Sequence, residues 1–235
     1  MIEESGKAIL ARKRAKHDEV AASVFEAAAD HIVKAKAKSE PEALLWMVPA
    51  QHEPLVPLPP ERRERFREHL DFCATLAFRE PEETADQVAV DKTEPEDAPL
   101  SVAACTTCQG RCCKNMGGDT ALLLPADFGR YRQRNPGVSA AEVIDAYLSC
   151  LPEVSTQDGC VYLGAQGCAL PREMRDDICN SYYCDSLRWL RMAEKESGTS
   201  AAILVAAHDG VPERIAVVAS DGSRQEIANL VEEPE

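Results

Sequence analysis

The feature that most constrains this chain is the clustering of its cysteines. Nine of the ten lie between Cys105 and Cys184, and four of them form the run Cys105-Thr-Thr-Cys108-Gln-Gly-Arg-Cys112-Cys113. Thiols this close in sequence are too many to be ordinary core residues. Short spacings let one turn of backbone direct several sulfurs to a single point, as metal sites require. The pattern therefore indicates thiolate–metal chemistry.

The charge of the chain narrows the partners that it can have. Its formal net charge is −14 over 235 residues, whereas non-specific nucleic-acid binding and docking on anionic lipid both need clusters of Lys and Arg. No stretch approaches the ~20 apolar residues of a membrane-spanning helix. We therefore expect neither a nucleic acid nor a membrane as partner.

The start of the chain bears on the compartment. Met1-Ile-Glu-Glu-Ser-Gly-Lys lacks both the basic and the apolar region of a secretory signal peptide, which predicts a cytoplasmic protein. Disulfides are rare in the reducing cytoplasm, so clustered cysteines there are expected to be metal ligands or redox groups. The alternative is a disulfide scaffold in an oxidising compartment, but cysteine makes up about 4% of the chain, below the ~8–10% of disulfide-dense domains.

Composition and periodicity predict an α+β fold. It is mainly helical, with a small cysteine-rich module organised by metal and a C-terminal antiparallel β-meander. We expect four successive parts: a helical region over 1–79, an acidic and disordered linker over 80–100, a cysteine-cluster metal-binding module over 101–192, and a β-hairpin or meander over 193–235. The linker is predicted from its many acids and its prolines, which cannot form a packed core.

Within the N-terminal region, an i, i+4 row of Val20, Val24, Ala28 and Ile32 predicts a helix over 5–39. Six prolines make 40–60 an extended connector, whose apolar residues 44–47 are expected to pack onto another part of the chain. A second helix is predicted over 61–78.

In the cysteine module, the apolar run 121–124 predicts a short buried strand. Pro125 then begins a helix that reaches Arg134. Ser139 and Glu142 form a capping box for a further helix. Beyond the module, three apolar runs separated by Asp209-Gly210 and Asp221-Gly222 predict the meander.

The full set of clustered cysteines resembles a known family. After the opening run come Cys160-Val-Tyr-Leu, a Gly-Cys168 segment and Arg175-Asp-Asp-Ile-Cys179-Asn-Ser-Tyr-Tyr-Cys184. This order is similar to that of the bacterial YkgJ-like cysteine-cluster proteins, described as carrying a zinc- or iron-chelating domain. The resemblance covers about 80 residues and implies these metal ligands: Cys105, Cys108, Cys112, Cys113, Cys160, Cys168, Cys179 and Cys184.

One position departs from the family pattern. The family commonly has Arg-Pro before the penultimate cysteine, whereas this chain has Arg175-Asp176. A helix cap from Asp176 or Asp177 can replace the stiffening that the proline would give.

Eight thiolates allow more than one cofactor. Two tetrahedral Zn²⁺ sites would use all of them, and one [4Fe–4S] cluster would use four. The adjacent pair Cys112-Cys113 suits a bridging arrangement or two neighbouring centres. Thiolates bind both zinc and iron–sulfur clusters, so the spacing leaves both open. A redox-active Cys105/Cys108 pair is less favoured, because no thioredoxin-like βαβ pattern precedes it.

Several residues beside the cysteines have predicted supporting roles. Arg111 and Lys114 can balance thiolate charge, while Asp119 and Asp127 are expected to be caps. The glycines 110, 117 and 118 can let backbone amides approach sulfur. An apolar shell is expected from Tyr162, Tyr182 and Tyr183.

The remaining cysteines and the histidines are predicted to be structural. Cys73 lies on the apolar stripe of the second helix and is read as a core residue, as is Cys150. None of the histidines has a His or Cys partner at i+3, and His69, with Cys73 at i+4, faces a core thiol. No ligand is therefore predicted among His17, His31, His52, His69 and His208.

These observations favour a metal-binding protein whose zinc ion or iron–sulfur cluster is structural or serves metal handling. One alternative is an iron–sulfur enzyme of redox or methyl-transfer chemistry, implied by a resemblance to flagellin lysine methylases, which carry a similar cysteine cluster. Another is an adaptor that binds a protein partner through its N-terminal helices and has a structural metal site.

Overall fold

The computed structural model describes residues 6–79, 99–165 and 167–231, and the predicted disordered linker lies almost entirely outside them. The chain forms two compact units, each assembled from segments far apart in sequence. The sheet unit comprises Met1–His52, Asp97–Cys108 and Tyr183–Glu235, and the cysteine unit comprises Glu53–Glu96 and Gln109–Tyr182. This division differs from the four consecutive parts expected from the sequence.

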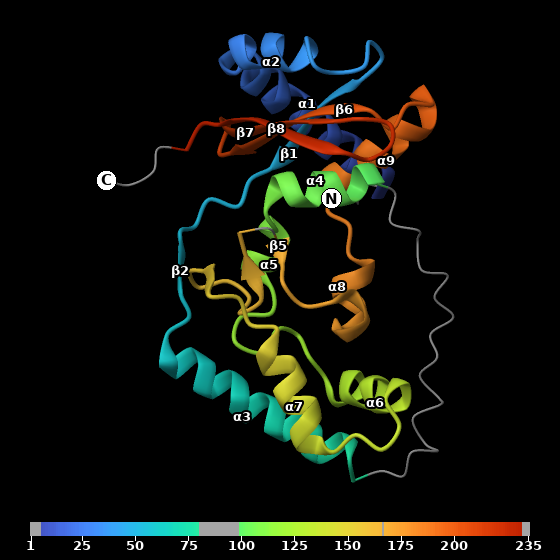
Figure 1. Ribbon diagram of the computed structural model, residues 1–235. Helices are drawn as coiled ribbons and strands as arrows, with labels where there is room; N and C mark the ends of the chain where they lie inside the picture. Colours follow the sequence, from blue (N-terminus) through green and yellow to red (C-terminus); the bar gives the residue numbers. More distant parts are fainter. Residues whose placement is uncertain (1–5, 80–98, 166, 232–235) are drawn as a thin grey trace, which may run out of the picture. The chain divides into compact units, whose positions relative to one another are not determined.

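The sheet unit is built on a four-stranded sheet of order β1-β6-β7-β8 (Figure 1). The strands are β1 (Leu44–Pro49), β6 (Ala202–His208), β7 (Val211–Val218) and β8 (Arg224–Asn229). The last three pair antiparallel in chain order, which confirms the predicted meander. An α+β fold is thus present, as composition and periodicity predict.

Helices cover both faces of this sheet (Figure 1). On one face, Ile203 and Val205 of β6 pack against α1 (Gly6–Ala27) and α2 (Ala29–Lys36). On the other, Ala202 and Leu204 pack against α4 (Pro99–Cys108) and α9 (Asp185–Ser197). Because successive side chains of a strand point to opposite faces, a strand segment buried on both sides is apolar at every position, as β6 is from Ala202 to Ala207.

The predicted N-terminal helix is present as two helices that meet at Ala28. Its apolar row packs within the protein, since Val24, Ala28 and Ile32 are buried against the sheet.

The extended connector expected over 40–60 contains a strand that the sequence did not predict. Leu44–Pro49 forms β1 and pairs in parallel with β6, with Trp46 opposite Leu204. The indole Nε1 of Trp46 donates a hydrogen bond to Ser186 Oγ, so its one polar atom is satisfied where the ring is buried. A Pro at the end of an edge strand costs no ladder bond, which is why Pro49 is tolerated there.

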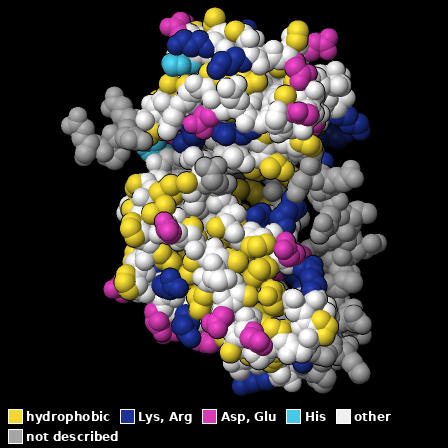
Figure 2. Space-filling model, in the orientation of Figure 1, with side chains coloured by type: hydrophobic (Ala, Val, Ile, Leu, Met, Phe, Trp, Pro, Cys, Tyr) yellow, Lys and Arg dark blue, Asp and Glu magenta, His cyan; other side chains and the backbone are white. Residues whose placement is uncertain are grey.

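The cysteine unit has a helical core. Its main helices are α3 (Pro60–Ala77), α6 (Pro125–Arg134) and α7 (Ala140–Ser149), which match predicted helices. Phe66, Phe128 and Tyr147 are fully buried among them. Figure 2 shows further hydrophobic side chains gathered on the surface of this unit.

Short elements complete the cysteine unit and carry most of its thiols. Two small antiparallel ladders join β2 (Leu55–Pro57) to β3 (Val154–Thr156) and β4 (Leu163–Gly164) to β5 (Gly167–Cys168). Three short helical segments are α5 (Arg111–Asn115), η2 (Arg172–Met174) and α8 (Asp177–Ser181).

Among the local predictions in this unit, the capping box of α7 is confirmed and one strand is wrong. The Ser139–Glu142 capping box is present, with Ser139 N donating to the Glu142 carboxylate at 2.8 Å. The strand expected over 121–124 is instead a turn, because Ala121 and Leu122 both have positive φ and Ala121 N bonds to Gly117 O. A left-handed pair cannot continue a strand ladder.

Within the described ranges, no helix is long and apolar enough to cross a bilayer.

Candidate metal centre

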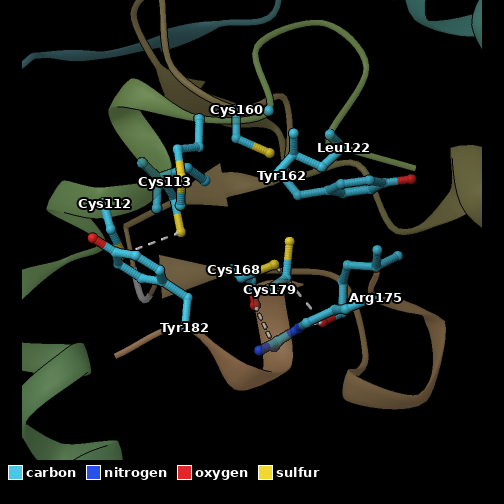
Figure 3. A pocket seen from close by; sticks show the side chains of 14 residues that line it. Cys112, Cys113, Leu122, Cys160, Tyr162, Cys168, Arg175, Cys179 and Tyr182 are labelled. Carbon is cyan, nitrogen blue, oxygen red and sulfur yellow. Dashed lines mark hydrogen bonds between the residues drawn. The ribbon is translucent and has the colours of Figure 1, made fainter. Parts of the chain in front are cut away.

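Five of the eight predicted ligands line one cavity of the cysteine unit: Cys112, Cys113, Cys160, Cys168 and Cys179. Figure 3 shows the sulfurs of Cys113, Cys160, Cys168 and Cys179 directed into the same space. The cavity holds about 70 Å³, and one water needs roughly 10–15 Å³ on this measure. The thiols therefore surround a space for something larger than one water.

The first two thiols come from the start of α5. Gly110 precedes this helix with a φ of 79°, a left-handed conformation that a side chain would strain. The turn brings the sulfurs of Cys112 and Cys113 to 3.9 Å from each other. The adjacent pair therefore points into one site, as a bridging arrangement requires.

Backbone hydrogen bonds fix the third thiol beside the first two. Cys160 N donates to Cys113 O at 3.3 Å, and the next amide, of Val161, donates to Gly118 O at 3.1 Å. These bonds join segments more than forty residues apart in the chain. They hold Cys160, itself buried, at the wall of the cavity.

The remaining two thiols are placed by a small hairpin and a capped helix. Cys168 lies on β5, whose partner strand β4 follows Cys160 closely in sequence. Cys179 lies on α8, where Asp176 accepts a hydrogen bond from Ile178 N at 2.7 Å as the N-cap. The cap expected in place of the family's proline is therefore present.

Gly117 allows the backbone to pass close to the sulfur of Cys160. Its φ is +87°, and a Cβ built there would lie 3.3 Å from Cys160 Sγ and 3.3 Å from Ala121 Cα. A side chain at this position would crowd the thiol from behind. The backbone thus passes close to this sulfur, and the approach of an amide N–H to it stays a prediction.

One charged side chain stands among the described residues that line the cavity. Arg175 donates from Nε to Leu170 O at 2.7 Å and from Nη2 to Cys168 O at 3.3 Å (Figure 3). These two carbonyls hold the guanidinium at the cavity wall. Its positive charge would favour an anionic group inside. Tyr162 and Tyr182 also line the cavity, which agrees with their predicted role as an apolar shell.

Burial and mutual proximity govern the ionisation of the thiols. A hydrogen bond from Cys113 lowers the pKa of Cys112 to about 7, and the same bond raises the pKa of Cys113 far above its usual value. Burial raises the pKa of Cys160 to about 11 and that of Cys179 to about 12. Charge on Cys168 would raise the pKa of each of these last two thiols further. Several thiolates can therefore coexist here only beside a cation, which reverses this preference.

The other three predicted ligands belong to the sheet unit. Cys105 is exposed on α4, and Cys108 is buried at the end of that helix. Cys184 precedes α9 and packs at the edge of the same apolar cluster as Cys108. Tyr183, predicted to lie in the apolar shell, packs against this cluster as well.

Charged residues near the cysteines have partners of their own. Lys114, predicted to balance thiolate charge, forms an ion pair with Glu53 at 2.6 Å. Asp119 is not a cap, because it accepts hydrogen bonds from Arg62 at 2.5 Å and Arg65 at 2.8 Å. Burial alone would raise the pKa of Asp119, but these hydrogen bonds outweigh it and hold the pKa below its usual value.

Asp127 and the two isolated cysteines have the predicted structural roles. The Asp127 carboxylate accepts a hydrogen bond from Leu124 N at 2.7 Å at the start of α6. Cys73 is fully buried in the core of the cysteine unit, and Cys150 packs against that core while its thiol donates to Ala146 O.

The prediction that no histidine is a candidate ligand overlooked one group. His52, His208 and Glu213 of the sheet unit each place a ligand atom within 4.8 Å of the others. A spacing of i+3 or i+4 does not connect these residues, because His208 and Glu213 meet across a hairpin and His52 comes from a distant segment. The nearest sequence signal is His208 and Glu213 on either side of the Asp209-Gly210 turn.

Comparison of the chain with protein-family models, with curated proteins and with solved structures finds no match. The resemblance to the YkgJ-like proteins therefore stays a prediction from the cysteine pattern.

Proposed function

We propose that this protein binds a metal centre through the cysteine thiolates of the cavity in the cysteine unit. The observation that carries the proposal is the convergence of five thiols from four separate elements or turns on one space. Soft thiolate ligands select zinc or iron–sulfur centres over hard cations such as Mg²⁺ or Ca²⁺.

The spacing of the thiols favours an iron–sulfur cluster over a single zinc ion. Sulfurs around one tetrahedral Zn²⁺ lie about 3.8 Å apart, given Zn–S bonds of about 2.3 Å. Among the residues described, no three of these thiols have sulfurs all within 4.8 Å of one another, although the Cys112–Cys113 pair is at 3.9 Å. In a cluster each cysteine binds a different iron, so the sulfurs stand further apart.

The lining of the cavity supports a binding or electron-transfer role. Its described residues are cysteines, apolar side chains, two tyrosines and Arg175, with no His, Asp or Glu to act as a general base near neutral pH. A [4Fe–4S] cluster with four thiolates is anionic in its usual states, which suits the neighbouring Arg175. The cluster would supply one-electron redox chemistry or a structural cross-link, and the protein would supply the thiolates, the apolar shell and the guanidinium.

Metal and sulfide content, with an absorption spectrum, of protein purified without oxygen tests this proposal. We expect iron with matching acid-labile sulfide and a broad band near ~400 nm. Zinc without sulfide or colour would keep thiolate binding but refute the cluster. Protein free of both metals, after reconstitution with each, would refute the whole proposal.

Single Cys→Ser variants test the ligand assignment. We expect Cys113→Ser, Cys160→Ser, Cys168→Ser and Cys179→Ser each to lower metal content. The matched controls are Cys73→Ser and Cys150→Ser, which change thiols of the same unit that do not line the cavity and should leave metal content unchanged. Retention of metal by Ser variants at 105, 108 and 184 would confine the centre to the cavity, whereas loss would extend the ligand set to all eight positions.

A further inference from the structure

The sheet unit carries a group of three metal-ligating side chains that the cysteine chemistry does not use. The rings of His52 and His208 stack in parallel with centroids 4.6 Å apart, and His52 Nδ1 lies 2.5 Å from Glu213 Oε1. One ligand atom of each residue lies within 4.8 Å of the other two. Two imidazoles and one carboxylate are a ligand set of mononuclear zinc and non-haem iron sites.

A β-bulge brings Glu213 to this group. In the pairing of β6 with β7, Ala206 lies opposite Arg214 and Ala207 lies opposite Pro212, so Glu213 is the extra residue. A bulge re-aims a side chain that regular pairing would place elsewhere. His208 is the last residue of β6, directly before the turn that leads back to Glu213. The local fold of the hairpin thus places the two side chains together.

The carboxylate of Glu213 is buried and incompletely satisfied. The residue is 4% exposed, and its Oε2 has no hydrogen-bond partner. Arg214 Nη1 lies 3.3 Å from Oε2 as an ion pair, while the rest of this guanidinium donates to Gln51 O and Thr107 O. Burying a carboxylate is costly unless opposite charge compensates it. Oε1 is the oxygen that faces the imidazoles, and its partner there is His52 Nδ1.

We propose that His52, His208 and Glu213 form a second metal site, without thiol ligands, for one divalent ion of the zinc class. Ligands of such an ion stand at about 2.0–2.1 Å from it, and hence about 3.3 Å from each other in a tetrahedral site. His52 Nδ1 and Glu213 Oε1 would have to separate by less than about 1 Å to admit it. The ion takes the place of the hydrogen bond between His52 and Glu213. Arg214 holds the second carboxylate oxygen, as partners of ligating carboxylates do.

The site would keep an open coordination position. The side chain of His52 is 53% exposed and that of His208 is 26% exposed, so water can reach the ion from the side of the imidazoles. Three protein ligands with a water in the fourth position are the arrangement of catalytic zinc, whereas structural zinc sites are closed. The proposal is independent of the thiolate centre, because it uses none of its residues.

Titration of the chelator-treated, reduced full-length protein with Co²⁺ alone tests this site. Thiolate ligands give Co²⁺ intense sulfur-to-metal charge-transfer absorption, whereas imidazole and carboxylate ligands give only weak d–d bands. We expect His208→Ala and His52→Ala each to bind one Co²⁺ fewer per chain than the wild type, with the charge-transfer absorption unchanged. The matched control is His31→Ala on α2, which should bind Co²⁺ as the wild type does.

A Cys168→Ser variant separates this proposal from the proposed function. It should lose charge-transfer absorption but keep the Co²⁺ equivalent that depends on His208. Equal Co²⁺ stoichiometry in wild type, His52→Ala and His208→Ala would overturn the second site, whatever the thiols bind. Because both histidines are partly exposed, these variants are expected to fold. Zn²⁺ should also raise the melting temperature of the Cys168→Ser variant more than that of the Cys168→Ser/His208→Ala double variant, because an ion that binds only the folded protein stabilises it. An equal shift of the melting temperature in the two variants would refute the second site.

Discussion

Replacing Gly117 by alanine tests whether the backbone behind Cys160 shapes the thiol cavity. Gly117 has a φ of +87°, a conformation that costs a residue with a side chain about 1–3 kcal/mol. The new Cβ would also lie 3.3 Å from both Cys160 Sγ and Ala121 Cα, so the turn or the thiol must move by a few tenths of an ångström. Such overpacking typically costs a further ~1–3 kcal/mol. We expect Gly117→Ala to lose about 2–6 kcal/mol of unfolding free energy in total.

The neighbouring Gly118→Ala is the matched control. Gly118 also has a positive φ, +43°, but a Cβ there would meet nothing within 4 Å. It therefore carries the backbone strain without the crowding, and should cost only about 1–3 kcal/mol. Urea denaturation of the reduced, metal-free variants, followed by circular dichroism, gives both values, and metal content after reconstitution gives the effect on the site. Equal losses of stability in the two variants, with equal metal content, would refute the claim that Gly117 supports Cys160.

Three further changes probe the elements that hold the cavity. Asp176→Ala removes the N-cap of α8, so it should lower the free energy of unfolding by about 1 kcal/mol and lower metal retention through Cys179. Asp176→Asn can still cap the helix and should restore both stability and metal retention. Thermal denaturation and metal analysis measure the two effects. Asp119→Asn removes the carboxylate held by Arg62 and Arg65, for a loss of about 1 kcal/mol near neutral pH. Because the folded-state pKa of Asp119 lies below its usual 3.8, its contribution to stability is present above that pH and is lost as the pH falls below it. The urea midpoints of wild type and variant should therefore converge in acid. Midpoints that stay equally far apart at every pH would contradict this prediction. Phe66→Ala empties a fully buried site that contacts Tyr162 edge to face and should cost about 3–5 kcal/mol; a loss under 1 kcal/mol in urea denaturation would contradict its place in the core.

Local signals in the sequence predicted the N-terminal helices, the helices α3, α6 and α7, and the meander, but not α4, α5, α8 or α9. Pro125 at the first turn of α6 and Ser139 with Glu142 at the start of α7 act through contacts within four residues, so the sequence contains them in full. Strand β1 is different. Its six residues end in proline and have no alternation, and they become a strand because β6 offers a parallel edge more than 150 residues later. A pairing so distant leaves no local signal.

The candidate metal sites show the same contrast between local signals, which the sequence contains, and long-range contacts, which it does not reveal. The cysteine pattern predicted thiolate–metal chemistry, and five of its eight members line the cavity. Their grouping depends on bonds such as Cys160 N to Cys113 O, which spacing alone does not reveal. His52 and Glu213 are 161 residues apart, and their contact depends on one bulged residue in β7. Periodicity arguments assume regular elements, so a bulge removes the very signal that they use.

The sequence predicts that metal organises the cysteine-rich part of the chain. The apolar core of the cysteine unit allows this prediction to be tested. Small metal-dependent domains unfold without their metal because they bury little else. Here Phe66, Leu70, Phe128 and Tyr147 are all at most 1% exposed and lie on α3, α6 and α7 themselves, in an apolar cluster that also contains Cys160. Burying one such side chain contributes about 1.5–3 kcal/mol, so this cluster can hold α3, α6 and α7 in place by itself. We therefore expect chelation under reducing conditions to leave the helical circular dichroism nearly unchanged. It should instead loosen α5, α8 and the β4–β5 hairpin, measured as faster amide hydrogen exchange in these segments than in α3. Loss of most helical signal on metal removal would show that the thiol centre, and not the apolar core, determines the fold of this unit.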